Sequence, residues 1–212
     1  MNPADFITQN LRLDPVPSLP GIRLYKAHAG SRLSRLSGED DADPPAPYWA
    51  YQWAGGLALA QHFRCHPALV ASKQVLDLGA GSGLVGIVAA GAGARVEAAE
   101  IDPNGKAAIA LNAAANGVAI GLRPIDLTGP QPDDIDLIAA GDVFYNADVA
   151  RHMLPFLQRC QAAGIDVLIG DPDRRDLPLD QLDLLASYKV SDVGDARDSA
   201  ERIGRVYRLR SQ

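Results

Sequence analysis

The clearest chemical pattern in this sequence is an aspartate followed by three alternate glycines. Asp77 lies in a short apolar run that is typical of a buried parallel strand, and Gly79, Gly81 and Gly83 come next. Glycines let bare backbone N–H groups approach a ligand, and the apolar stretch that follows predicts a helix whose N-terminus would face the same ligand. The pattern therefore predicts a nucleotide-binding turn between a strand and a helix.

Two ligand classes fit this turn. The segment from Gly81 to Gly86 matches G-x-G-x-x-G, and Glu100 lies near the distance at which dinucleotide folds place a ribose-binding acid. Asp77 favours a different ligand, because a carboxylate beside the turn would repel a pyrophosphate but would attract the ammonium and sulfonium groups of S-adenosylmethionine. A glycine-rich corner with no ligand is the third alternative.

A second strand is predicted over 94–102, and it ends in acids. Because a parallel sheet binds ligands at the carboxyl ends of its strands, we expect Glu100 to accept hydrogen bonds from the ribose hydroxyls, with Ile101 beside it in the cofactor site. Asp102 precedes Pro103, which is typical of the N-cap of the next helix.

The elements that position these residues predict an α/β fold. Further strands are expected over 122–126, 135–145 (with its exit) and 166–172, helices over 147–161 and 179–186, and two antiparallel edge strands over 188–193 and 205–209. We therefore expect a Rossmann-like, doubly wound seven-stranded sheet, mostly parallel with an antiparallel strand near the C-terminus. This domain should span 47–212, and the N-terminal extension 1–46 is either a lid or docking arm, or a partly ordered tail with solvated charges.

Composition excludes several classes of function. The chain has 212 residues, 47% of them hydrophobic, and a formal net charge of −6, which disfavours sequence-independent binding to nucleic acid. Only Cys65 and Cys160 are cysteines, so no disulfide framework is expected. The sequence shows neither a secretory signal nor a membrane-spanning apolar run. We expect a cytoplasmic protein.

Four aromatic residues gather in the segment 47–56: Tyr48, Trp49, Tyr51 and Trp53. Their rings could attract a sulfonium or an ammonium group by cation–π interaction. The alternative is that some of them, Trp49 above all, pack a helix onto the sheet. Both interpretations stay open.

A metal site is not expected. His62, Cys65 and His66 fall at helical spacing, but Pro67 follows at once and no fourth ligand is evident.

Together these motifs resemble the seven-strand (class I) methyltransferases, and within them a protein-lysine branch. The run 75–83 resembles motif I of the superfamily, whereas Trp53-Ala-Gly-Gly, Glu100-Ile-Asp-Pro-Asn, Asp142-Val-Phe-Tyr145 and Gly170-Asp-Pro carry the narrower match. Nucleic-acid N-methyltransferases typically carry Asn/Asp-Pro-Pro-Tyr/Phe where this chain has Asp142-Val-Phe-Tyr145. The branch's expected Trp-Pro-Gly-Gly is Trp-Ala-Gly-Gly here.

The resemblance implies S-adenosylmethionine as cofactor and a protein lysine as substrate, with the β subunit of electron-transfer flavoprotein as the expected partner of a monomeric enzyme. The cofactor site then comprises Trp53, Asp77, Gly79, Gly81, Gly83, Glu100, Ile101, Asp126 and Asp142. Asp126 would approach the adenine amino group, unless it forms an Asx turn before Gly129. Asp142 would orient the lysine amine, and Tyr145 would line its channel.

Other substrates and another class stay open. A ribosomal protein or a small amine could be the methyl acceptor. The glycine turn also fits an NAD-dependent oxidoreductase or a nucleotide-binding module.

Overall fold

The computed structural model describes residues 2–36, 46–190 and 202–211. The acidic cluster Glu39, Asp40, Asp41 and Asp43 lies outside the described residues. The described helices are α1 Pro3–Asn10, α2 Ala54–Cys65, α3 Leu84–Gly91, α4 Pro103–Ala115 and α5 Ala147–Ala162. The strands are β1 Arg12–Pro15, β2 Arg23–Lys26, β3 Gln74–Leu78, β4 Arg95–Ala99, β5 Gly121–Leu122, β6 Leu137–Gly141, β7 Asp166–Asp171, β8 Leu182–Val190 and β9 Arg202–Leu209.

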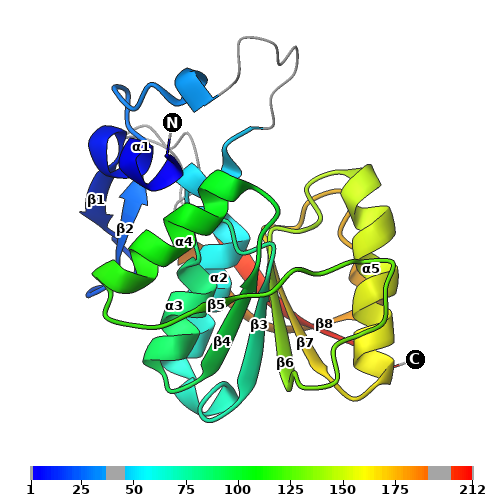
Figure 1. Cartoon of the computed structure of the whole chain (residues 1–212). Helices are drawn as coiled ribbons and strands as arrows, with labels where there is room; N and C mark the ends of the chain where they lie inside the picture. The colour runs from blue at the N-terminus through cyan, green and yellow to red at the C-terminus, as the bar shows by residue number, and fades with distance from the viewer. Residues whose placement is uncertain (1, 37–45, 191–201, 212) are drawn as a thin grey trace.

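A seven-stranded sheet forms the centre of the molecule, with strand order β5-β4-β3-β6-β7-β9-β8 (Figure 1). The five strands from β5 to β7 pair in parallel, and β9 pairs antiparallel with both β7 and β8. The predicted fold class is confirmed. Because β9 is inserted between β7 and β8, only β8 of the two predicted edge strands lies at the edge.

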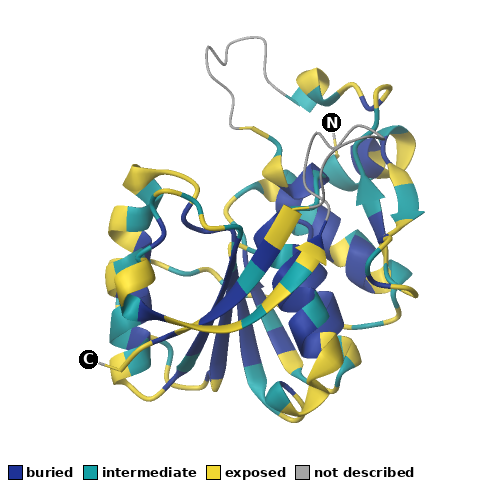
Figure 2. Ribbon diagram, turned by 180° about the vertical axis from the view of Figure 1, so that it is seen from behind, coloured by how far each residue is buried: buried dark blue, intermediate teal, exposed yellow. Residues whose placement is uncertain are grey.

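Side chains that alternate along the strands divide the hydrophobic core between the two faces of the sheet. Val75 packs in the cluster that contains the apolar sides of α2 and α3, whereas its neighbour Leu76 packs in the cluster that contains α5. Successive side chains of a strand point to opposite faces, so a doubly covered sheet needs the near-continuous apolar runs seen here. The central strands are almost entirely buried (Figure 2).

One predicted element is wrong and another is too long. Residues 179–186 do not form a helix: Leu179–Gln181 make a single 3-10 turn and β8 begins at Leu182. Pairing with β9, through an irregularity between Leu184 and Ala186, overrides the local preference of this leucine-rich segment. The strand predicted over 122–126 is limited to Gly121–Leu122, because Pro124 has no N–H to donate to a ladder.

The N-terminal extension contains α1 and the β1–β2 hairpin, which pack beside α4 (Figure 1). Two asparagines of α4 hold the hairpin through its backbone. The Asn112 side chain accepts the N–H of Tyr25 at 2.8 Å, and the Asn116 side chain accepts the N–H of Arg23 at 2.9 Å. Asn112 also donates to the carbonyl of Ser82 at 2.8 Å. One side chain thus connects the extension to the glycine turn.

Among the described residues, no helix is both long and apolar enough to cross a membrane.

Candidate active site

Asp77 lies in β3, and its carboxylate is buried at the start of the glycine turn. Its Oδ2 accepts the N–H of Gly86 in the first turn of α3, at 2.8 Å. Burial above all, with a smaller contribution from the nearby Glu100 carboxylate, raises the pKa of Asp77 to about 7 against the opposing effect of that hydrogen bond. A buried carboxylate with one backbone partner can still accept from a cationic ligand.

The glycine turn has the backbone conformation that its sequence predicts. Gly79, Gly81 and Gly83 all have positive φ, between 54° and 79°, which side chains rarely permit. At Gly83 an added Cβ would also lie 3.2 Å from Ile109. The turn is fixed to the end of β4, because the N–H groups of Gly79 and Ala80 both donate to the carbonyl of Ala99.

Glu100 follows β4 and organises the same turn. Its Oε2 accepts the N–H of Gly81 at 2.9 Å, and its Oε1 accepts those of Ile101 at 2.7 Å and Asp102 at 2.9 Å. Ile101 is 90% exposed, which leaves an apolar side chain uncovered beside a carboxylate. This pair suits the sugar and the flat base of a nucleoside. Asp102 caps α4 as predicted, accepting from the N–H of Asn104.

Asp126 adopts the Asx turn that the sequence left open. Its Oδ1 accepts from both the N–H and the hydroxyl of Thr128, at 2.8 and 2.7 Å, and the hydrogen bonds from Thr128 hold its pKa below the usual range. The carboxylate is exposed, so the amino group of a base could still reach it. The geometry is compatible both with the Asx turn alone and with an additional contact to the adenine amino group.

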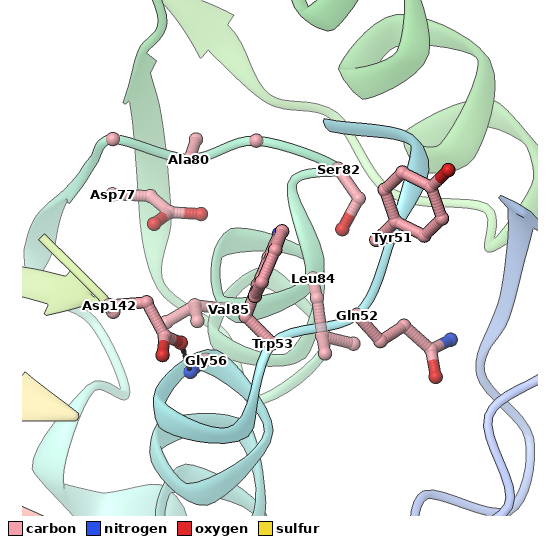
Figure 3. A pocket seen from close by; sticks show the side chains of 13 residues that line it. Tyr51, Gln52, Trp53, Gly56, Asp77, Ala80, Ser82, Leu84, Val85 and Asp142 are labelled. Atoms are coloured by element: carbon pink, nitrogen blue, oxygen red, sulfur yellow. Dashed lines mark hydrogen bonds between the residues drawn. The ribbon is translucent and has the colours of Figure 1, made fainter. Parts of the chain in front are cut away.

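A pocket of about 40 Å³ lies between the glycine turn and the N-terminus of α2. Figure 3 shows the side chains that surround it, with Asp77 and the Trp53 indole directed inward. Its lining residues are Tyr51, Gln52, Trp53, Gly56, Asp77, Gly79, Ala80, Gly81, Ser82, Leu84, Val85, Gly141 and Asp142. Sites for drug-sized ligands enclose roughly 300 Å³ or more, so this pocket accounts for only part of a nucleotide-sized site.

Asp142 is buried among groups that the sequence does not bring together. Its Oδ2 accepts the N–H of Gly56 in α2 at 2.7 Å, and its Oδ1 pairs with Arg174. The fully buried Asp171 accepts the N–H of Arg174 at 2.6 Å. Burial raises the pKa of both aspartates, that of Asp171 to about 6, against the opposing effect of Arg174. Arg174 is a site residue that sequence patterns missed.

Tyr145 belongs to an aromatic cluster at the pocket mouth. Its ring lies 5.4 Å from that of Tyr48, which lies 5.5 Å from that of Trp53. The Trp53 indole N–H donates to the Tyr48 carbonyl at 2.8 Å. Trp49, by contrast, is buried with Phe6 of α1, so the packing interpretation holds for Trp49.

His62 lies in the last turn of α2, and His66 is the C-cap residue of this helix. His62 is hydrogen-bonded to the Tyr188 hydroxyl at 2.9 Å, and its ring lies 4.6 Å from that of His66. Among the residues that the structure describes, no three His, Cys, Asp or Glu side chains are placed to hold a metal ion.

Comparison with known proteins identifies the family. A family model described as lysine methyltransferase matches residues 52–186. The chain is 35% identical over 203 residues to the electron transfer flavoprotein beta subunit lysine methyltransferase of Xenopus laevis, covering 90% of this chain and 80% of that protein. It is 40% identical over 131 residues to the protein of the same name from Rattus norvegicus, covering 60% of this chain and 51% of that protein.

Solved structures share the fold at lower identity. The chain superposes on a candidate RNA methyltransferase from Pyrococcus horikoshii with a TM-score of 0.58 and 16% identity, covering 84% of this chain and 94% of that one. The chain spans about half the length of the first curated relatives it matches. The matched segment contains Gln52, Trp53, the glycine turn, Glu100 and Asp142. The chain belongs to the lysine methyltransferase family.

Proposed function

We propose that this protein transfers a methyl group from S-adenosylmethionine to a lysine side chain of the β subunit of electron-transfer flavoprotein. The observation that carries the proposal is the family match over 52–186, which contains every pocket-lining residue except Tyr51. The names of the relatives that align over most of their length supply the substrate. A monomer in the cytoplasm remains part of the proposal, to be tested by sedimentation and cell fractionation.

The residues of the pocket, together with Glu100 and Ile101 after β4, fit S-adenosylmethionine. Asp77 offers a carboxylate to an α-ammonium, Glu100 offers one to ribose hydroxyls, and Ile101 offers an uncovered apolar surface to adenine. The side-chain nitrogen of Gln52 is buried without a hydrogen-bond partner, and this residue lines the pocket. A buried donor without a partner is costly, which is expected where a ligand completes the site. The cofactor, when bound, supplies a methyl group already activated by its sulfonium.

The chain's own residues then have two tasks, positioning the amine and excluding water. Lysine has an ordinary pKa of about 10.4, and removal from water lowers it, so an apolar approach favours the neutral, nucleophilic amine. Tyr48, Trp53 and Tyr145 form such an approach at the pocket mouth. Proton loss to solvent before entry suffices, so no general base is assigned.

Transfer of a labelled methyl group tests the proposal. The chain is incubated with S-adenosylmethionine and purified electron-transfer flavoprotein, and the β subunit is analysed by peptide mass spectrometry. We expect added mass on lysine, competition by S-adenosylhomocysteine and no effect of NAD. Label on a ribosomal protein or a small amine, with none on the β subunit, would refute the assigned substrate. Calorimetric binding of NAD instead of S-adenosylhomocysteine would refute the class of enzyme.

A further inference from the structure

We propose that Tyr48, Trp53 and Tyr145 form a binding site for the cationic head of a methylated lysine, with Tyr48 as its central, specificity-determining residue. The inference rests on the proposed lysine methylation and deepens it. It concerns which methylation states of the lysine can remain bound, rather than whether the first methyl group is transferred.

The geometry of the three rings carries this inference. Tyr48 contacts both others: its ring centroid is 5.5 Å from Trp53 at 62° and 5.4 Å from Tyr145 at 44°. Rings set edge-on or tilted to each other do not cover each other's faces completely, so part of the ring surface is left for a ligand. Such faces attract ammonium groups within about 6 Å, and quaternary ammonium ions are bound this way because they cannot be satisfied by hydrogen bonds.

Exposure distinguishes this cluster from ordinary core packing. Tyr48 is 47% exposed and Tyr145 is 44% exposed, although both rings are large and largely apolar. Trp49, the immediate neighbour of Tyr48, is only 2% exposed. The segment therefore buries one aromatic side chain against α1 and leaves the adjacent one at the pocket mouth, where a ligand can cover it.

The local charge favours a cation. Burial, and after it the neighbouring Tyr48 and the Glu100 carboxylate, raise the pKa of Tyr145, so the phenol stays protonated and its ring lies within the field of an acid. Trp53 also lines the cofactor pocket, so the cluster continues directly into that pocket. A lysine that approaches the pocket beside Trp53 on the side of Tyr48 would lie next to the Tyr48 ring.

The backbone fixes the spacing of the cluster. Tyr48 begins a 3-10 turn, Tyr48–Ala50, and its carbonyl accepts the Trp53 indole N–H at 2.8 Å. The neighbouring Ala50 carbonyl accepts the N–H of Ala27, which follows β2 of the extension, at 2.9 Å. The position of Tyr48 thus depends on the extension, whereas Tyr145 is positioned by the loop after β6.

Binding of small probes tests the site without any turnover. The probes are the Nα-acetyl amides of lysine, dimethyllysine and trimethyllysine, together with the neutral tert-butyl analogue of trimethyllysine. They are titrated into the protein saturated with S-adenosylhomocysteine. The chain has two tryptophans, so the conservative variant Trp49→Phe leaves Trp53 as the only source of indole fluorescence. We expect saturable changes in Trp53 emission, with trimethyllysine binding more tightly than its neutral analogue by roughly threefold or more.

Two variants of Tyr48 distinguish the contribution of its ring from that of its hydroxyl group. Tyr48→Phe retains the ring and should bind trimethyllysine within about twofold of wild type, whereas Tyr48→Leu should weaken it by roughly three- to tenfold. Both should keep wild-type affinity for S-adenosylhomocysteine, and thermal melts confirm that they are folded. In methylation assays, Tyr48→Leu should also shift the products toward monomethyllysine.

The outcomes distinguish this inference from the proposed function. Equal affinity for trimethyllysine and its neutral analogue, or unchanged binding in Tyr48→Leu, would overturn the cation site even if the enzyme methylates lysine normally. A preference for the cationic probes that disappears in Tyr48→Leu would support the site even if the β subunit were not the substrate.

Discussion

The carboxylate of Asp142 accepts the backbone N–H of Gly56, with 2.7 Å between Oδ2 and the nitrogen. This bond joins the end of β6 to the first turn of α2, the helix that begins directly after Trp53. The same carboxylate pairs with Arg174 through its other oxygen. Both oxygens of Asp142 therefore already have protein partners at the site where we expected it to orient the lysine amine.

We predict that Asp142→Asn lowers the free energy of unfolding by about 1.5–3 kcal/mol, because both oxygens of Asp142 accept hydrogen bonds and the amide NH₂ would have to face one of the two donors, the Gly56 N–H or Arg174. Cofactor affinity should fall as well, since the N-terminus of α2 carries Trp53. Chemical denaturation and titration with S-adenosylhomocysteine measure the two effects.

Asp166→Asn is the matched control for that variant. Asp166 pairs with Arg208 at the opposite end of the sheet, and both side chains are more exposed than that of Asp142. An exposed pair contributes roughly 0–1 kcal/mol, so this variant should be nearly neutral. If Asp142→Asn kept full stability and cofactor affinity but lost methyl transfer, Asp142 would be an amine-orienting residue instead.

Asp77 predicts a pH dependence of stability. Burial raises its pKa to about 7 in the folded chain, whereas an unfolded aspartate titrates near ~3.9. Between these values the folded state holds a proton that the unfolded state has lost, so the contribution of Asp77 to stability falls as pH rises from about 4 to about 7. Asp77→Asn stays neutral and should be more stable than wild type at pH 8, on the order of 2–4 kcal/mol.

Asp77→Asn should also weaken binding of the cofactor. A neutral amide cannot pair with an α-ammonium, so Asp77→Asn should bind S-adenosylhomocysteine at least tenfold less tightly at pH 8. Asp136→Asn is the control, because Asp136 also accepts a backbone N–H, that of Gln74 at 2.8 Å, but lies away from the pocket. Stability curves for wild type and Asp77→Asn that stay parallel from pH 5 to pH 8 would contradict the assignment.

Sequence patterns predicted the parallel half of this fold better than its edge. The glycine turn was predictable because positive φ demands glycine, and all three glycines adopt it. The segment Leu182–Val190 was misjudged as partly helical, because a strand at a sheet edge depends on its partner more than on its own residues. Sequence patterns therefore predict elements whose conformation depends on their own residues. They fail for segments whose conformation depends on pairing with a distant strand.

In the candidate site, too, sequence patterns identified some residues and missed others that only the fold brings together. Asp77 and Glu100 could be proposed from the sequence because Asp77 lies near the end of one recognisable strand and Glu100 directly follows another. Arg174 could not, because it reaches Asp142 across 32 positions of the chain through a loop without a motif. Tyr48 and Tyr145 stand almost a hundred residues apart in the printed sequence, and only the fold brings their rings to 5.4 Å.

Glu100 gives a prediction that concerns the glycine turn. Its carboxylate accepts three backbone N–H groups, from Gly81, Ile101 and Asp102. Glu100→Ala should weaken binding of S-adenosylhomocysteine by roughly tenfold or more, since it removes a charged acceptor and loosens the turn. Glu97→Ala, in the preceding strand β4 and paired with Arg123, should leave the affinity unchanged. Equal calorimetric affinities for the two variants would remove Glu100 from the site.

Substitution of Ile101 can change cofactor binding without changing the stability of the fold, which substitution of a buried residue cannot do as cleanly. Because this side chain is 90% exposed, Ile101→Ser removes almost no packing and should change the free energy of unfolding by less than about 0.5 kcal/mol. If adenine covers the side chain when the cofactor binds, the lost apolar contact should weaken binding by about 1 kcal/mol, or roughly fivefold.

Leu184→Ser provides the comparison. Leu184 is also a large, exposed apolar residue, 55% exposed, but it lies on the edge strand β8. Calorimetric titration with S-adenosylhomocysteine and with adenosine should show the same loss for both ligands in Ile101→Ser and no loss in Leu184→Ser, because only the adenine end is affected. A loss for S-adenosylhomocysteine without one for adenosine would place Ile101 against the amino-acid end of the ligand. Wild-type affinity for both would mean that Ile101 stays uncovered when the cofactor is bound.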